Sequence, residues 1–333
     1  MDRTKARPAR KGLRAELSGE SKVLSPMSAS RFRSTLSLPL RFRRQLFAAT
    51  VVGAAVLAGC TSLEMQQRKW IFRAVPAAAT SQAELARFSE ANRMEDVWIE
   101  HVSQVSGRDI RLHALWAPND DTGAPVVLYL HGARRDLGAN VYRIEGLRDL
   151  GFSVLAIDYR GFGNSTNELP SEHAAVEDAR AAWRWMAENR PGLDHYLFGY
   201  SLGGAVAVQL AAQLGSDPDQ GMAAPKGLML ESTFTSIQEM FQTMRWGWLP
   251  ITPLITERFD SLGAIGRVTA PLLVVHGSED RFVPVRFGQA LFERAGAVKK
   301  RFLLVEGGTH YSTIRRGEDQ YRAALRELFG LGT

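Results

Sequence analysis

Six short runs of consecutive apolar residues recur in the chain and limit the folds that it can adopt. They are Val126–Leu130, Ser153–Ile157, Tyr196–Phe198, Leu228–Leu230, Leu272–Val275 and Phe302–Val305. Strands that are apolar on both faces are typical of a parallel sheet covered by helices on each side. The pattern therefore predicts an α/β fold.

The segments around these runs fit such a sheet. An alternating pattern over Val97–Val102 and Ile110–Ala117 predicts an antiparallel hairpin ahead of the six runs. Four stretches have the periodicity of crossover helices: Glu172–Asn189, Leu202–Leu214, Pro284–Ala295 and Glu318–Phe329. We expect a doubly wound, mostly parallel sheet of eight strands with helices on both faces.

Residues 233–265 interrupt the alternation of strands and helices. This stretch is too long and too apolar for a simple loop, with Trp246 and Trp248 among its large side chains. We expect a small lid over the carboxyl edge of the sheet.

The strongest chemical signal is Gly199-Tyr200-Ser201-Leu202-Gly203-Gly204, which lies between an apolar run and an Ala/Gly-rich helix. A serine on a tight strand-to-helix turn needs glycine two residues before and after it, because neighbouring backbones leave no room for side chains. The context favours Ser201 as a nucleophile over a chance G-x-S-x-G.

A serine hydroxyl needs a base to remove its proton and an acid to orient that base. His310 comes just after the last apolar run, and Asp280 follows the run before it. The order Ser201, Asp280, His310 is the order expected for this kind of sheet. Glu231, at another strand end, stays open as an alternative orienting acid, and Glu279 is a weaker one.

Acyl transfer also requires donors for the developing oxyanion. The backbone N–H of Leu202 is the first candidate, because it starts the helix after the nucleophile. The second candidate is the N–H of Ala133, in the loop after Leu130-His131-Gly132, with Arg134 as the alternative. Asp158 and His131 are expected to stabilise turns and loops.

The N-terminal 59 residues have the layout of an export signal. Arg41-Phe42-Arg43-Arg44 is followed by an apolar stretch, Leu46–Gly59, which is shorter than the roughly 20 residues needed to span a bilayer. Its end, Leu57-Ala58-Gly59-Cys60, resembles the lipobox of bacterial lipoproteins. That resemblance implies acylation of Cys60, the chain's single cysteine; a cysteine buried in a short helix is the alternative.

The charge of the chain is divided unevenly. Residues 1–59 hold twelve Lys/Arg and three acids, a net charge of +9, so the rest of this +6 chain carries −3. The rest of the chain offers no basic footprint for phosphates, and we expect no nucleic-acid partner.

Six blocks in order resemble the α/β-hydrolase superfamily, most closely its serine-aminopeptidase-like branch, which includes acyl-protein-thioesterase-like members. The blocks are YLHGARRDLGAN, VLAIDYRGFGNS, LFGYSLGGAVAVQLAA, LESTFTS, LLVVHGSEDRFVP and LVEGGTHYS. The resemblance implies hydrolysis through an acyl-enzyme on Ser201, His310 and Asp280, with no metal or organic cofactor. Ala133 departs from it, since many relatives carry asparagine there.

These observations predict three segments: a signal over 1–59, a tether over 60–94, and an α/β-hydrolase domain over 95–330 with a lid near 233–265. The expected protein is a serine hydrolase of esters or thioesters, EC 3.1, held by a lipid anchor in a bacterial cell envelope. It would face the periplasm, on the inner or outer membrane. Two alternatives stay open, a serine aminopeptidase and a non-catalytic lipid-binding lipoprotein.

Overall fold

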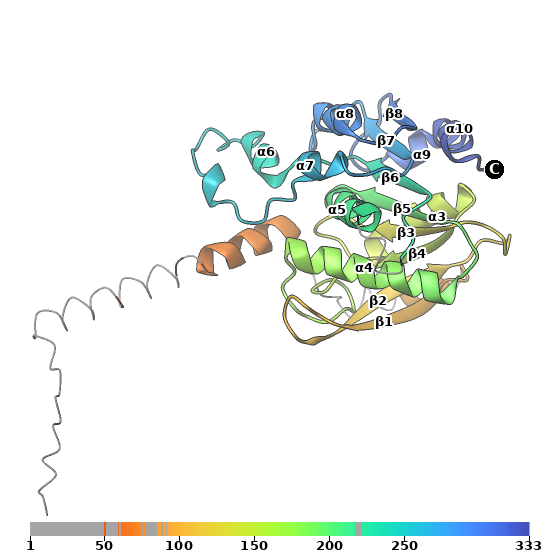
Figure 1. The fold of residues 1–333 in the computed structure, drawn as a ribbon, viewed down its shortest axis with the longest axis horizontal. Helices are drawn as coiled ribbons and strands as arrows, with labels where there is room; N and C mark the ends of the chain where they lie inside the picture. The colour runs from red at the N-terminus through yellow and green to blue at the C-terminus, as the bar shows by residue number, and fades with distance from the viewer. Residues whose placement is uncertain are drawn as a thin grey trace, which may run out of the picture. The chain divides into compact units, whose positions relative to one another are not determined.

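The computed structural model describes residues 50, 59, 61–74, 76, 85–87, 89–90, 92–216 and 222–332, and these contain one eight-stranded sheet (Figure 1). Its strand order is β1-β2-β4-β3-β5-β6-β7-β8. The strands are β1 Glu95–Val102, β2 Asp109–Ala117, β3 Val126–Leu130, β4 Ser153–Ile157, β5 His195–Tyr200, β6 Gly227–Glu231, β7 Leu272–Gly277 and β8 Lys300–Val305. Strand β2 runs antiparallel to both its neighbours, and all the other neighbouring pairs are parallel. The expected mostly parallel eight-stranded sheet is confirmed.

Helices cover both faces of the sheet. One face carries α4 (Glu172–Asn189), α5 (Leu202–Ser216), α7 (Ser261–Ile265) and α8 (Val285–Arg294). The other carries α3 (Val141–Asp149), α9 (Thr313–Arg316) and α10 (Glu318–Phe329). Successive strand residues point to opposite faces, so each apolar run supplies both cores.

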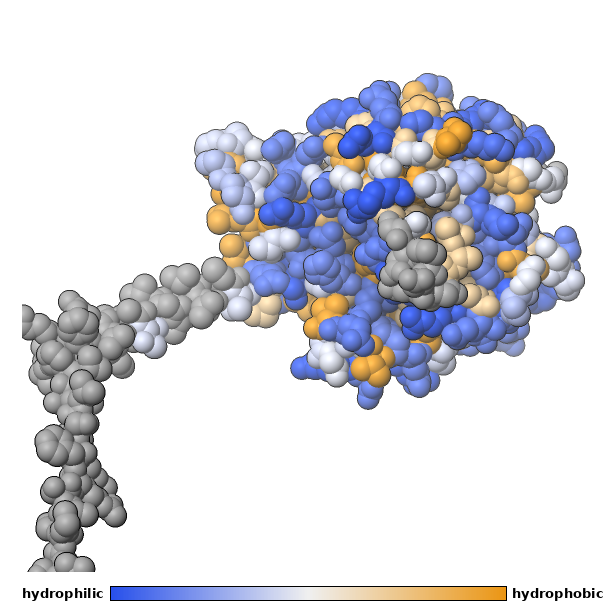
Figure 2. Space-filling view, viewed as in Figure 1, coloured by the Kyte–Doolittle hydropathy of each residue, from blue (hydrophilic) through white to orange (hydrophobic). Residues whose placement is uncertain are grey.

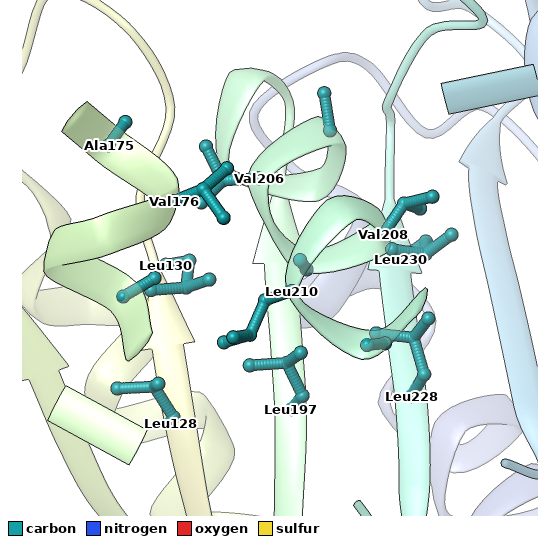
Figure 3. Close-up of a cluster of buried hydrophobic side chains, with 14 of the residues drawn as sticks. Leu128, Leu130, Ala175, Val176, Leu197, Val206, Val208, Leu210, Leu228 and Leu230 are labelled. Carbon is teal, nitrogen blue, oxygen red and sulfur yellow. The ribbon is translucent and has the colours of Figure 1, made fainter. Parts of the chain in front are cut away.

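Strand β3 illustrates this division. Leu128 and Leu130 are buried beneath α4 and α5 (Figure 3), whereas Val127 and Tyr129 pack beneath α3 on the opposite face. Full burial of each such side chain contributes about 1.5–3 kcal/mol to folding. An apolar run therefore forms a strand here because every position in it leaves water.

Helix α3 is the crossover that sequence patterning did not indicate. Its sequence contains Gly146, which lowers intrinsic helix propensity by about 1 kcal/mol relative to alanine. A Cβ at Gly146 would lie 3.1 Å from Ile314 Cδ1 on α9. Close packing between the two helices favours glycine at this position, against its local preference.

The N-terminal segment that we expected to act as a tether also packs against the domain. Residues 61–72 are helical, and the helix ends in Ile71 and Phe72, both buried. The Phe72 ring meets the Phe259 ring edge-on, with 5.8 Å between the centroids. Residues 71 and 72 are thus part of the same core as α4 and α5.

The expected lid segment contains α6 (Ile237–Gln242), a 3-10 turn η3 (Thr252–Leu254) and α7. Ile265 in α7 is fully buried with the core under α5 and α8. Trp246 and Trp248, between α6 and η3, are instead exposed. Some apolar residues of this segment are therefore part of the domain core, and others lie on the surface.

Cys60 lies outside the described residues, as does nearly all of the apolar stretch that precedes it. Among the described residues, no helix is both long enough and apolar enough to cross a bilayer.

Candidate active site

The predicted site residues follow strands that end at the same edge of the sheet. Ser201 follows β5, Asp280 follows β7 and His310 follows β8. The loop that begins at Gly132 follows β3, where the chain first passes to β4 and then returns to the other side of β3. Ligand sites of open α/β sheets form in the crevice at such a switch point.

The turn that carries Ser201 depends on glycine. Ser201 adopts φ 53°, a left-handed conformation that L residues rarely occupy outside strained turns. A Cβ at Gly203 would lie 2.0 Å from the Leu130 carbonyl oxygen, and one at Gly199 would lie 2.4 Å from the Gly203 oxygen. Larger residues at these two positions would push α5 away from β3 and β5.

His310 lies between the serine and the acid. Its Nδ1 is 2.7 Å from Asp280 Oδ2, and its Nε2 is 3.2 Å from Ser201 Oγ. Because an ionised carboxylate can only accept, Nδ1 carries the ring proton and Nε2 accepts the hydroxyl hydrogen of Ser201. The structure thus brings together the three residues singled out in the sequence.

Asp280 is held as an anion. Burial of its side chain would raise its pKa, but hydrogen bonds with His276 and His310 oppose this, as do the His310 charge and the Val283 N–H, which is 2.9 Å from Oδ1. Together they keep the pKa of Asp280 well below its ordinary value. An aspartate with this pKa remains ionised at neutral pH and accepts a hydrogen bond from Nδ1 of His310.

Glu231, the alternative acid, has other partners. Its Oε1 lies 2.8 Å from Nη2 of Arg143, its Oε2 accepts from the Tyr321 hydroxyl, and all three side chains are fully buried. Arg143 Nη2 also lies 3.3 Å from the His310 carbonyl oxygen, to which the Tyr200 hydroxyl donates at 3.0 Å. Glu231 is therefore linked to the His310 backbone through Arg143, and it does not contact the His310 ring.

Asp158 supports the loop after β3. Its Oδ1 accepts from the Leu137 N–H at 3.0 Å and lies 3.4 Å from Nε2 of His131. Nδ1 of His131 is 2.6 Å from the Gly132 carbonyl oxygen. These buried groups hold the loop between Gly132 and Leu137 against the sheet.

The two candidate second oxyanion donors differ in availability. The N–H of Arg134 donates to the Phe72 carbonyl at 2.9 Å, so it is already occupied. Ala133 lines the cavity beside Ser201, and among the described residues its N–H has no hydrogen-bond partner. Leu202 lines the same cavity at the first position of α5, where N–H groups have no partner within the helix.

The cavity at Ser201 has a volume of about 210 Å³. Its apolar wall comes from the helix of residues 61–72 and from α6 with the residues that follow it, 237–254, which we call the α6 region. The wall includes Trp70, Ile71, Ile237, Met240 and Met244. No Asp or Glu is among its described lining residues, although Arg134 and Arg135 are. Elsewhere too, no three His, Cys, Asp or Glu residues of the described part lie close enough to hold a metal ion.

Known proteins resemble this chain in fold and in sequence. An esterase of Pyrococcus furiosus superposes with a TM-score of 0.58 at 19% identity, over 73% of this chain and 94% of that chain. Residues 123–264 match the family described as serine aminopeptidase, S33. An uncharacterised protein of Mycobacterium tuberculosis is 36% identical over 217 residues, which cover 62% of this chain and 73% of that protein. This chain belongs to the α/β-hydrolase superfamily.

Other α/β-hydrolase relatives are more distant or longer. The lysophosphatidylserine lipase ABHD12 of Danio rerio is 32% identical over 189 residues, or 53% of this chain and 48% of that protein. The chain thus spans about half the length of that lipase. The esterase domain of a Rhodothermus marinus protein superposes with a TM-score of 0.51 at 20% identity, over 71% of this chain and all of that domain.

Several residues of this α/β-hydrolase site were not apparent from the sequence. Arg143 and Tyr200 hold the His310 backbone, and Phe72 occupies the N–H of Arg134. An isolated arginine on an unrecognised helix carries no motif. The one available signal was the apolar pair Ile71-Phe72 at the end of a helical segment, which indicates packing without naming the partner.

Proposed function

We propose that this chain is a serine hydrolase that cleaves carboxylic ester or thioester bonds through an acyl-enzyme. The observation that carries the proposal is the alignment of Ser201 Oγ, the His310 ring and the Asp280 carboxylate, with contacts of 3.2 and 2.7 Å. The esterases and lipases among its relatives support the same reaction class.

In the proposed reaction, Ser201 Oγ attacks the substrate carbonyl carbon while His310 Nε2 takes the hydroxyl proton. The N–H groups of Ala133 and Leu202 stabilise the resulting oxyanion, each donor supplying about 3 kcal/mol. His310 then protonates the departing alcohol or thiol. Water, deprotonated by His310, attacks the acyl-enzyme, and the carboxylic acid leaves as Ser201 recovers its proton.

The cavity favours a substrate with an acyl chain and an acidic group. Its apolar wall can enclose a hydrocarbon chain, and Arg134 and Arg135 provide positive charge beside Ser201. Lysophosphatidylserine, named for the lipase relatives, has both features. An aminopeptidase would instead need a carboxylate to hold the substrate's α-amine, and the described lining residues include none.

A substrate panel tests the proposed function. Purified protein is assayed with p-nitrophenyl esters of increasing chain length, acyl thioesters, a lysophospholipid, and aminoacyl and prolyl amides. We expect kcat/KM to be highest for the acyl esters or thioesters and to rise with chain length. Faster cleavage of the amides would favour the aminopeptidase, and failure to cleave any of them would favour a lipid-binding protein.

We also infer that Cys60 carries a lipid anchor that holds the enzyme in the cell envelope. The basic cluster, the apolar stretch and Leu57-Ala58-Gly59-Cys60 support this inference, because they resemble a lipoprotein signal. Several acyl chains on one residue exceed the single chain that gives only marginal membrane binding.

Palmitate labelling in a bacterial host tests the anchor. The wild-type chain should incorporate labelled palmitate and fractionate with membranes, and Cys60→Ser should accumulate as an unlabelled precursor. Ser62→Ala, two residues away, is the matched control and should be processed normally. A mature protein with a free thiol at Cys60 would contradict the inference.

A further inference from the structure

Exposed apolar side chains are concentrated on two segments that each contribute a residue to the cavity lining. Of the fifteen large apolar side chains that are exposed in the described part of the chain, eight lie in residues 61–72 and 244–254. They are Leu63, Met65, Trp70, Met244, Trp246, Trp248, Ile251 and Leu254. We call these eight residues the mouth patch. Figure 2 shows apolar side chains along the edge where the α6 region meets the N-terminal helix.

The two segments of the mouth patch are held together by polar contacts. Gln67 Nε2 donates to the Leu254 carbonyl at 2.7 Å, and Gln67 Oε1 accepts from the Thr256 N–H at 2.9 Å. Arg68 Nε lies 2.7 Å from Glu257 Oε1 in an ion pair whose carboxylate is almost fully buried. These contacts fix the two segments relative to each other. The mouth patch is therefore an ordered surface on which apolar side chains remain exposed to water.

We propose that the mouth patch docks on the surface of a lipid bilayer and turns the cavity mouth toward it. The proposal rests on the anchor and the acyl substrate inferred above. Trp246 is 55% exposed, Trp248 is 73% exposed and Leu254 is 56% exposed. Tryptophan is enriched at membrane interfaces, where its ring meets both apolar chains and water.

The position of Cys60 in the sequence favours a bilayer as the occupant. In the sequence, Cys60 directly precedes the described helical residues 61–72, and Trp70 follows it by ten residues. An acylated Cys60 would therefore hold the mouth patch next to the lipid headgroups. Lys69 and Arg245 are exposed on the same two segments and have no carboxylate partner among the described residues, which suits an anionic lipid surface.

Docking would give an acyl substrate a short path from the bilayer. Trp70 and Met244 belong both to the mouth patch and to the lining of the cavity that contains Ser201. A single-chain lipid ester could pass from the membrane along this apolar surface without exposing its hydrocarbon to water. Each methylene group that stays out of water on this path keeps a stabilisation of about 0.8 kcal/mol.

Fluorescence quenching tests the docking directly. The lipid-modified full chain is reconstituted into vesicles of phosphatidylcholine and phosphatidylglycerol, with or without brominated acyl chains, which quench tryptophan on contact. We expect bromolipid to quench wild-type fluorescence, and Trp246→Phe/Trp248→Phe to lose most of that quenching. Trp98→Phe is the matched control, because Trp98 is 39% exposed on β1, outside the mouth patch; it should retain the quenching.

Turnover separates docking from catalysis. Trp246→Ser/Trp248→Ser should lower the hydrolysis of a vesicle-embedded ester several-fold and leave that of a soluble ester unchanged, since neither tryptophan lines the cavity. Val298→Ser, at a side chain 97% exposed outside the mouth patch, should change neither rate.

Three outcomes would overturn the docking proposal. The first is the absence of bromolipid quenching at Trp246 and Trp248. The second is a fall in hydrolysis of the vesicle-embedded ester by Val298→Ser as large as that by the double serine variant. The third is a lipid-free dimer of the wild type that the double serine variant loses, which would make the mouth patch a self-association surface. A chain that is quenched but hydrolyses no ester would refute the proposed function and leave the docking intact.

Discussion

Ser201→Ala is expected to lower ester hydrolysis by roughly 10⁴–10⁶-fold, because the hydroxyl that forms the acyl-enzyme is removed. Labelling by a fluorophosphonate probe should also be lost, since that probe reacts only with an activated serine. The fold should be retained: alanine and serine share the same Cβ, and so meet the same strain at φ 53°. The measurements are kcat/KM, probe labelling and the midpoint of urea unfolding.

Ser232 offers a matched control for this substitution. It follows β6 with φ 50°, is fully buried, and its hydroxyl has no hydrogen-bond partner among the described residues. Ser232→Ala should leave both activity and labelling near wild type. Full activity in Ser201→Ala, or loss of labelling in Ser232→Ala alone, would show that Ser201 is not the nucleophile.

Asp280→Asn should lower kcat by roughly 10⁴-fold with little change in fold. The asparagine amide can donate to Nδ1 of His310, which then places the ring proton on Nε2, facing Ser201. In that tautomer His310 cannot accept the hydroxyl proton. Steady-state kinetics at neutral pH measure the loss, and unfolding in urea confirms that the variant is folded.

Glu231→Gln is the comparison that identifies the orienting acid. It leaves the Arg143 charge buried without its partner, and breaking a buried pair in this way costs about 3–5 kcal/mol of stability. We expect a marked fall in the urea midpoint, and a much smaller loss of kcat than in Asp280→Asn at temperatures where the variant is folded. A larger loss of kcat in Glu231→Gln would transfer the orienting role to Glu231.

Local pattern was sufficient for most of the sheet and for the candidate residues. The runs Val126–Leu130 and Ser153–Ile157 match β3 and β4 at both ends, because nearly every position of a doubly covered strand is apolar. The glycines around Ser201 reveal the tight turn, because a side chain at Gly203 would collide with β3 and one at Gly199 would collide with α5. In a parallel sheet, residues that follow strand ends gather at one edge, so Asp280 and His310 could be placed beside Ser201 from chain order.

Only the tertiary structure decided between residues that sequence makes equivalent. Asp280 and Glu231 both lie at strand ends. Buried Arg143, on α3, forms an ion pair with Glu231, whereas Asp280 forms the hydrogen bond with His310. Ala133 and Arg134 are adjacent in the sequence. The Phe72 carbonyl, more than fifty residues earlier, accepts from the Arg134 N–H, and the Ala133 N–H stays available for an oxyanion. Such distinctions depend on contacts between segments far apart in the chain, whereas periodicity and spacing report only on neighbours along it.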